Sequence, residues 1–258
     1  MSLARGSSQG NNLAQPQTNA LLEALPAREQ SELMKELRPV SLPVGTVLFE
    51  ADTPPRYAHF ITSGMASIVT VLNGGDAVEV GLIGREGVAE KIHLLGPQLG
   101  MTRCFMQIQG TALRMNLKSL QERFVHSQPL LSLVHRLIQY ETLSLSQLSA
   151  CNRLHEVEER LARWILTVQD KTGDPEMRLT QEFLGQMLGA RRSTVNITAG
   201  TLQRAGLIVY KRSYLRIVDR QGLEDVACEC YPIVKKLFEN LYTNTSEFDL
   251  VRQGPNGR

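Results

Sequence analysis

The sequence lacks the features that mark membrane proteins, secreted proteins and several classes of enzyme. No apolar run approaches the roughly 20 residues needed to span a bilayer. The first 19 residues, rich in Ser, Gln, Asn and Gly, contain no apolar segment of the kind found in signal peptides. Neither a P-loop nor a Gly-x-Gly-x-x-Gly motif is present. We therefore expect a cytoplasmic protein with no membrane partner and a flexible tail at residues 1–20.

Cysteine is scarce, and its spacing argues against a metal or disulfide framework. The chain has four cysteines, at positions 104, 151, 228 and 230. Ligands of zinc or of an iron–sulfur cluster normally stand closer together in sequence, so we expect no metal and no such cluster. Only Cys228 and Cys230 are near neighbours. They are open to two interpretations, either two small buried helix residues or a redox- or metal-responsive pair.

Histidine is scarce as well, with five residues in the chain. In the β-rich part, His59 and His93 lack the His-x-His and Glu partners of a metal-binding jelly-roll enzyme. The sequence contains no recognisable nucleophile–base motif, so we expect the protein not to be an enzyme. Haem would depend on scattered residues such as His59, His93 or Cys104. Because a lone histidine is more often structural, the sequence argues against haem.

One C-terminal segment carries the most informative pattern, a short helix, a tight turn and a second helix. Thr180 suits the N-cap of the first helix, and Gly189 can adopt the left-handed conformation that ends it. The second helix places Arg192, Ser193 and Asn196 on one side, near its N-terminal end. A helix-turn-helix reads base edges in the major groove of DNA with polar side chains at that position.

Basic charge is concentrated in the same part of the chain. The whole sequence has 28 Lys and Arg against 26 Asp and Glu, but residues 178–220 hold eight basic and two acidic side chains. Such a concentration is typical of phosphate-contacting surfaces, although a solvated basic face is the alternative. Residues 211–214 read as a basic turn between two strands, which is the pattern of a wing. Lys211 and Arg212 at its tip could contact the phosphate backbone.

The preceding half of the chain reads as a β-rich domain followed by a long helix. Short β-type runs between residues 40 and 117 alternate with turn signals, including Ser63-Gly64 and the strong hairpin turn Asn73-Gly74, and predict a sandwich or jelly roll. Residues 21–37 predict one or two short helices. Residues 129–155 predict one long helix, because they contain no Gly and no internal Pro.

The long helix carries apolar residues at a spacing of three and four. This seam could pack against a second copy of the chain and give a homodimer; the alternative is a helix lying on its own β-domain. A further helix over residues 156–169 leads into the DNA-reading segment. The seam consists of Leu131, Val134, Ile138, Leu145 and Leu148.

This order of parts resembles the Crp/Fnr family of bacterial transcription regulators over roughly residues 21–232. The strongest motifs are Gly185-Gln186-Met187-Leu188-Gly189 and Arg192-Ser193-Thr194-Val195. The resemblance implies an α+β fold with an N-terminal β-roll, a long central dimerisation helix and a C-terminal winged helix-turn-helix. The expected domains are a flexible tail (1–20), a cyclic-nucleotide-binding-like β-roll (21–127), a dimerisation helix (128–155), a winged helix-turn-helix (156–232), and a C-terminal helix with a loose tail (233–258).

The resemblance also implies a homodimer that binds palindromic double-stranded DNA and contacts RNA polymerase. Arg192 falls at the position of the family's base-reading arginine, and Asn196 could read an adenine edge. Ser193, also on the base-reading side, stands where glutamate is frequent, and Ile197 where arginine is frequent in cAMP-dependent members. We therefore expect a different half-site. The expected phosphate contacts are Thr180, Arg191, Thr194, Lys211 and Arg212.

The cAMP-binding pattern of the family is not kept in this chain. Ala89 replaces the glycine of its Gly-Glu pair, although Glu90 remains, and Arg103 is followed by Cys104 in place of Ser or Thr. Glu90 and Arg103 are thus the candidate effector pocket, for an effector other than cAMP or cGMP whose identity stays unknown. The alternative function is an effector-binding module that acts through a protein partner rather than DNA.

Overall fold

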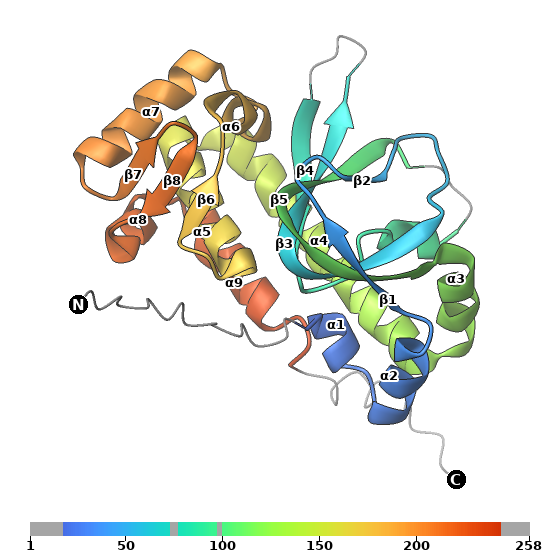
Figure 1. The fold of residues 1–258 in the computed structure, drawn as a ribbon. Coiled ribbons are helices and arrows are strands. Elements are labelled where there is room, and N and C mark those ends of the chain that lie inside the picture. Colours follow the sequence, from blue (N-terminus) through green and yellow to red (C-terminus); the bar gives the residue numbers. More distant parts are fainter. Residues whose placement is uncertain (1–17, 73–76, 97–99, 244–258) are drawn as a thin grey trace, which may run out of the picture.

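The computed structural model describes residues 18–72, 77–96 and 100–243, which form two lobes side by side (Figure 1). The Asn73-Gly74 turn and most of both expected tails lie outside these residues. Asn19, which the sequence analysis assigned to the N-terminal tail, is buried. Its side chain accepts a hydrogen bond from the backbone N–H of Leu22 (3.2 Å) and donates to the carbonyls of Ile61 and Gly87 (both 2.8 Å).

An antiparallel sheet forms the N-terminal lobe. Its strand order is β1-β5-β3-β4, and β2 also pairs with β5. The α+β fold with an N-terminal β-roll is as predicted. The strands are β1 (Arg38–Leu42), β2 (Val47–Phe49), β3 (Tyr57–Val71), β4 (Ala77–Ile83) and β5 (Thr102–Asn116), with a short 3-10 helix η1 (Lys91–Leu94) before β5.

Strands β3 and β5 are longer than the sequence predicted, with 15 residues each. Ser63-Gly64, interpreted as a turn, lies inside β3, where the register against β5 shifts. Gly64 has a φ of +74°, and a Cβ on Gly110 would lie 1.9 Å from the carbonyl oxygen of Ser63. Glycine is therefore required by a close backbone approach at a bulge, and the strands bend while they stay paired.

Helices cover the N-terminal lobe and lead to the second lobe. The two predicted short helices are α1 (Ala20–Glu23) and α2 (Ala27–Met34). After α3 (Leu117–His126), Ser127 caps the 27-residue α4 (Gln128–Leu154) by accepting the N–H of Leu130, so the predicted long helix is confirmed. Among the described helices, none combines the length and apolar character needed to cross a bilayer.

The predicted seam of α4 is only partly exposed. Val134 is fully buried in the core of its own lobe, so it cannot meet a partner and its assignment to the dimer interface is corrected. Leu131 and Ile138 are partly buried against the same core. Leu148 is half-buried, and Leu145 is 42% exposed. The first half of α4 thus packs on its own β-domain. The solvent-exposed face of the helix does not coincide with the row of apolar residues predicted as the dimer seam.

The C-terminal lobe combines helices with a small antiparallel sheet in the order β6-β8-β7. Strand β6 was not predicted, because three residues give too short a pattern. The helix before it runs past the predicted end to Thr172 and stops at Gly173, whose φ is +71°. The elements are α5 (Val157–Thr172), β6 (Glu176–Arg178), α6 (Gln181–Leu188), α7 (Arg192–Arg204), β7 (Ile208–Lys211), β8 (Tyr214–Ile217), α8 (Arg220–Val226) and α9 (Cys230–Glu239).

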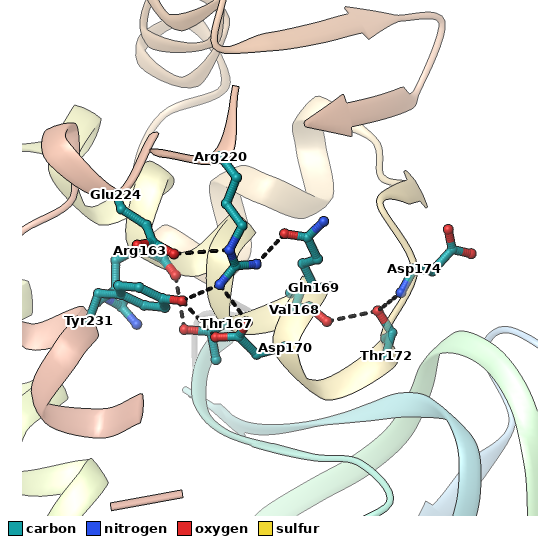
Figure 2. A network of polar contacts seen from close by, with 10 residues as sticks. All are labelled: Arg163, Thr167, Val168, Gln169, Asp170, Thr172, Asp174, Arg220, Glu224 and Tyr231. Carbon is teal, nitrogen blue, oxygen red and sulfur yellow. Dashed lines mark hydrogen bonds and ion pairs between the residues drawn. The ribbon is translucent and has the colours of Figure 1, made fainter. Parts of the chain in front are cut away.

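A polar network centred on Arg220 fastens α8 and α9 to α5 (Figure 2). The guanidinium donates to Glu224 (2.9 Å), to Asp170 (2.7 Å) and to the hydroxyl of Tyr231 (2.6 Å). Tyr231 in turn donates to the second oxygen of Asp170 (2.8 Å). Arg220 is one of the eight basic residues of segment 178–220, but its charge is used inside the lobe and does not add to a DNA-facing surface.

Candidate DNA-binding surface and interlobe cavity

The helix-turn-helix is formed by α6 and α7. Thr180 caps α6 by accepting the N–H of Phe183 (3.1 Å), and Gly189 ends it with a φ of +57°, as predicted. The N–H of Ala190 donates to the carbonyl of Gly185 (2.9 Å), which closes the turn within two residues of the next helix. Local capping and a left-handed glycine thus place the N-terminus of α7 at the surface.

Helix α7 separates a buried face from an exposed one. Val195, Ala199 and Leu202 are at most 2% exposed and pack in the core of the lobe. Thr194, one of the predicted phosphate contacts, is half-buried at the edge between the two faces. The exposed residues around the helix start are Arg191, Arg192, Ser193, Asn196 and Ile197.

The cations predicted to meet DNA have no acidic partners. Arg191, Arg192, Lys211 and Arg212 are exposed, and none forms an ion pair with any residue in the described ranges. Their charge is therefore uncompensated within the part of the chain that the structure describes. Uncompensated cations on one surface attract a polyanion and can displace its counterions.

The wing lies directly beside the recognition helix. Its turn has two residues, Arg212 and Ser213, with φ values of +50° and +68°, and not the four predicted, because Lys211 pairs with Tyr214 at the ends of β7 and β8. Positive φ at both central residues is the geometry of a tight hairpin turn. The N–H of Tyr210 donates to the side-chain oxygen of Gln203 on α7 (2.7 Å), which fixes the wing to the helix.

Asn196 has a neighbour that the sequence reasoning missed. The side-chain amide of Gln181, at the start of α6, donates to the side-chain oxygen of Asn196 (2.7 Å). This bond links the two helices of the motif and orients the amide of Asn196. An amide oxygen has two lone pairs, so Asn196 keeps one acceptor and its two donors for a base edge.

Glu90 and Arg103, the predicted effector pocket, each pair with a different residue in the structure. Glu90 is fully buried, accepts the N–H of His59 (2.7 Å) and lies 2.7 Å from the Nδ1 atom of the same residue. Arg103 pairs with Glu50 (3.2 Å) on the outer part of the sheet. Both side chains therefore already have partners, His59 for Glu90 and Glu50 for Arg103.

A cavity of about 220 Å³ lies instead between β4, α4 and α5, where the two lobes meet. The sequence analysis missed it, because its charged residues are spread through otherwise apolar helix and strand patterns. One pair crosses it, with Lys91 Nζ 2.5 Å from Glu141 of α4. The charged residues of its wall are Glu79, Lys91, Glu141, Arg163 and Lys171.

Two carboxylates of the N-terminal lobe bind side chains of α5 and so join the two lobes. Lys171 of α5 forms a buried ion pair with Glu86. Burial lowers the pKa of Lys171, but the charge of Glu86, the neighbouring Tyr140 and the hydrogen bonds to both together raise it. Glu79 of β4 accepts the indole N–H of Trp164 and the hydroxyl of Ser67 (both 2.9 Å). Burial raises the pKa of Glu79 to about 7 against the pull of these hydrogen bonds.

Three of the four cysteines lie together in the folded chain, and Cys104 is apart from them in β5. Cys228 and Cys230 are buried, and Cys151 and His155 from the end of α4 lie beside them. The sulfur atoms of Cys151 and Cys228 are 3.5 Å apart, so the predicted pair of Cys228 and Cys230 has a third cysteine beside it. The spacing of Cys151 and His155, one helical turn apart, is the signal that could have suggested a shared site.

Comparisons with known proteins agree with this geometry. Residues 159–226, from α5 to α8, match a family model described as a Crp-like helix-turn-helix domain. Electron transport regulator A of Shewanella oneidensis is 26% identical over 196 residues, which cover 71% of this chain and 76% of that protein.

Two solved structures share the fold over most of this chain. FixK2 from Bradyrhizobium japonicum has 15% identity and a TM-score of 0.64, covering 74% of this chain and 98% of its own. A transcriptional regulator of the Crp/Fnr family from Eubacterium rectale has 14% identity and a TM-score of 0.64, covering 80% and 96%. The fold implied by the sequence resemblance is confirmed.

Proposed function

This chain has the Crp/Fnr regulator fold and carries a Crp-like helix-turn-helix domain, and from that premise we propose that it is a transcription regulator that binds palindromic DNA as a homodimer. The observation that carries the proposal is the surface at the start of α7. Arg191 and Arg192 are exposed there beside the wing, and neither has an acidic partner in the described chain. Arg192 and Asn196 read bases, Ser193 lies between them, and the wing contacts phosphates.

The first test is selection of bound duplexes from a random pool with the purified protein. A palindrome with half-sites about one helical turn apart is the expected product. Binding to that duplex should weaken steeply with salt, since several phosphates are neutralised at once. Absence of any enriched sequence, together with binding that does not respond to salt, would contradict the proposal.

We place the dimer contact on the outward face of α4, centred on Thr142 and Ser149 and flanked by Ile138 and Leu145. Ser149 is exposed about two helical turns after Thr142, so both lie on one side of the helix. The hydroxyl of Thr142 donates to the carbonyl of Ile138 (2.8 Å), and that of Ser146 donates to the carbonyl of Thr142 (3.1 Å). Small side chains whose hydroxyls are satisfied within the helix can be buried against a second helix at little cost.

Arginine at the centre of this face should separate the dimer. Ser149→Arg is expected to give the mass of one chain in light scattering after size exclusion, because two charges would oppose each other across the two-fold axis. Val125→Arg on α3, at a site 65% exposed, is the matched control and should leave the mass unchanged. If Ser149→Arg is still a dimer, the interface does not lie on this face of α4.

We further propose that the interlobe cavity, and not the Glu90 and Arg103 pair, receives the effector. Its walls come from both lobes, so a ligand there would alter their relative position and hence the spacing of two recognition helices. Isothermal titration of candidate ligands against wild type and Arg163→Met is the test. A ligand that binds both proteins equally would exclude a role for Arg163 in the pocket.

The alternative is a regulatory module that acts through a protein partner without touching DNA. The unpaired cations of α7 and the wing favour the DNA-binding function, because uncompensated positive charge on one surface attracts a polyanion. Contact with RNA polymerase belongs to the same proposal as a second step, and pull-down of purified polymerase on a promoter duplex would test it.

A further inference from the structure

Four metal-ligating side chains meet where α4 ends and α9 begins. Cys151 lies in the last turn of α4, His155 follows that helix directly, and Cys228 and Cys230 come from the start of α9 and the residues before it. All three cysteines are at most 4% exposed. One ligand atom from each of the four residues lies within 4.8 Å of every other.

The separations fit a tetrahedral ion. Zinc binds thiolate sulfur at about 2.3 Å and imidazole nitrogen at about 2.0–2.1 Å, so ligands at tetrahedral angles are roughly 3.5–3.8 Å apart. The sulfurs of Cys151 and Cys228 are 3.5 Å apart, and the sulfur of Cys230 is 3.5 Å from Nδ1 of His155. We propose that Cys151, His155, Cys228 and Cys230 form a Cys3His site for one Zn²⁺ ion.

Neighbouring groups are arranged as they are around metal-bound ligands. The Nε2 atom of His155 lies 3.1 Å from the carboxylate of Glu229, which leaves Nδ1 to face the sulfurs. A carboxylate on the second ring nitrogen is the usual partner of a metal-bound histidine. The side-chain amide of Gln147 donates to the sulfur of Cys230 (3.1 Å), as amides do to bound thiolates.

Charge around the cluster also favours thiolate ligands. Arg163 is close enough to Cys151 to interact with it electrostatically. Three thiolates and Zn²⁺ would carry a net charge of −1, and binding would release the thiol protons to solvent. Arg160 and Arg163 are both buried beside this cluster, and the Nε atom of each lacks a hydrogen-bond partner among the described residues.

The ligand set favours zinc over other occupants. Thiolate-rich tetrahedral sites select zinc or iron–sulfur clusters, and a mixed Cys3His set is a common structural zinc site. A disulfide between Cys151 and Cys228 would leave Cys230, His155 and Glu229 without a role. A zinc ion uses all four ligands and both of their polar neighbours.

The site has a direct route to the helix-turn-helix. It joins the end of α4 to α9 at the point where α5 begins, so an ion would fix the joint between the dimer helix and the second lobe. Arg160 of α5, beside the cysteines, donates to the carbonyl of Leu188, the last residue of α6. A bound ion would thereby hold α5 and α6, on which the recognition helix α7 packs, in place.

Metal content measured on the full chain, without DNA, tests the site independently of the proposed function. Protein purified under reducing conditions should contain one zinc per chain. After exchange with Co²⁺ it should show the d–d absorption of tetrahedral cobalt and a thiolate-to-cobalt charge-transfer band. Octahedral cobalt spectra, or less than a tenth of one zinc after incubation with ZnCl₂, would overturn the proposal.

Variants locate the ion and separate it from a redox pair. Cys228→Ala and Cys230→Ala should lose most bound metal, whereas Cys104→Ala, at a buried cysteine in β5, should keep it. Loss of metal from Cys104→Ala alone would place the ion elsewhere. A wild-type protein that is metal-free and has only two free thiols after unfolding would show a disulfide and contradict the zinc site, as would stoichiometric iron and sulfide.

Melting temperatures test whether the ion stabilises the connection between α4 and the C-terminal lobe. Zinc should raise the melting temperature of wild type and of Cys104→Ala but not of Cys228→Ala, since a ligand of the folded state stabilises it. Equal melting temperatures of the zinc-loaded and metal-free wild type would overturn this consequence. If zinc binds but DNA does not, the metal site stands and the proposed regulator function fails.

Discussion

The cations of α7 and the wing differ from those of the interlobe junction in their exposure and in whether they have an acidic partner. Arg192 and Lys211 are exposed and unpaired within the described chain, whereas Lys171 is buried against Glu86 and Lys91 lies 2.5 Å from Glu141. An exposed unpaired cation costs little to keep, but a buried one must be compensated. The first kind can therefore serve an external polyanion, and the second kind supports the fold.

The largest expected effect comes from breaking the buried pair. Lys171→Met should lower the free energy of unfolding by about 3–5 kcal/mol, because it leaves the carboxylate of Glu86 buried without its partner. Urea unfolding followed by Trp164 fluorescence measures the change, and the exposed Lys211→Met should stay within about 0.5 kcal/mol of wild type. The double variant Lys171→Met with Glu86→Gln should recover part of the loss. Equal losses at positions 171 and 211 would remove the distinction between the two kinds of cation.

Glu79 makes the free energy of unfolding depend on pH. Because its folded pKa of about 7 lies above the ordinary 4.5, the folded protein binds a proton more tightly than the unfolded chain. That contribution is fully present below pH 4.5 and is lost as the pH rises through 7. Glu79→Gln lacks it, so the variant should gain on wild type by up to about 3 kcal/mol between pH 4.5 and 8, measured as the difference of two unfolding free energies. A constant difference across that range would contradict the role of Glu79.

The DNA-facing surface could be predicted from the sequence because its determinants are local. Thr180, Gly189 and the apolar spacing of α6 act within a few residues, so they indicate the same structure before and after folding. The same holds for the exposed side of α7, which follows from the positions of Val195 and Ala199. The wing turn is shorter than predicted by one residue on each side, and Arg220 is used inside the lobe.

The junction could not be predicted, because its contacts join distant parts of the chain. Lys171 and Glu86 are 85 positions apart, and Cys151 and Cys228 are 77 apart. Spacing along the sequence carries no information about such pairs until the fold is known. Val134 shows the same limit, because helical periodicity identified an apolar line on α4 but not which side the sheet would cover.

Arg192 tests whether the unpaired cations read sequence. Arg192→Ala should cost about 1–3 kcal/mol on the selected duplex, since it removes a bidentate contact to guanine. Fluorescence anisotropy against specific and scrambled duplexes measures it. Arg204→Ala, at the other end of the same helix, is the matched control and should lose much less. If Arg192→Ala loses equally on both duplexes, the residue contacts phosphate and not a base.

The smallest effect on DNA affinity is expected at the wing. It gives the sharpest comparison between an exposed unpaired cation and a buried paired one. Lys211→Ala should weaken binding by a similar factor on every duplex and reduce the slope of log affinity against log salt by about 0.9, the value for one phosphate contact. Its stability should not change, because the side chain is exposed and unpaired in the described structure. Lys171→Met should show the opposite result. Its free energy of unfolding should fall, but under conditions in which it is folded the slope of log affinity against log salt should equal that of wild type. A salt slope unchanged in Lys211→Ala would mean that the wing does not reach the backbone, and that α7 alone supplies the charge.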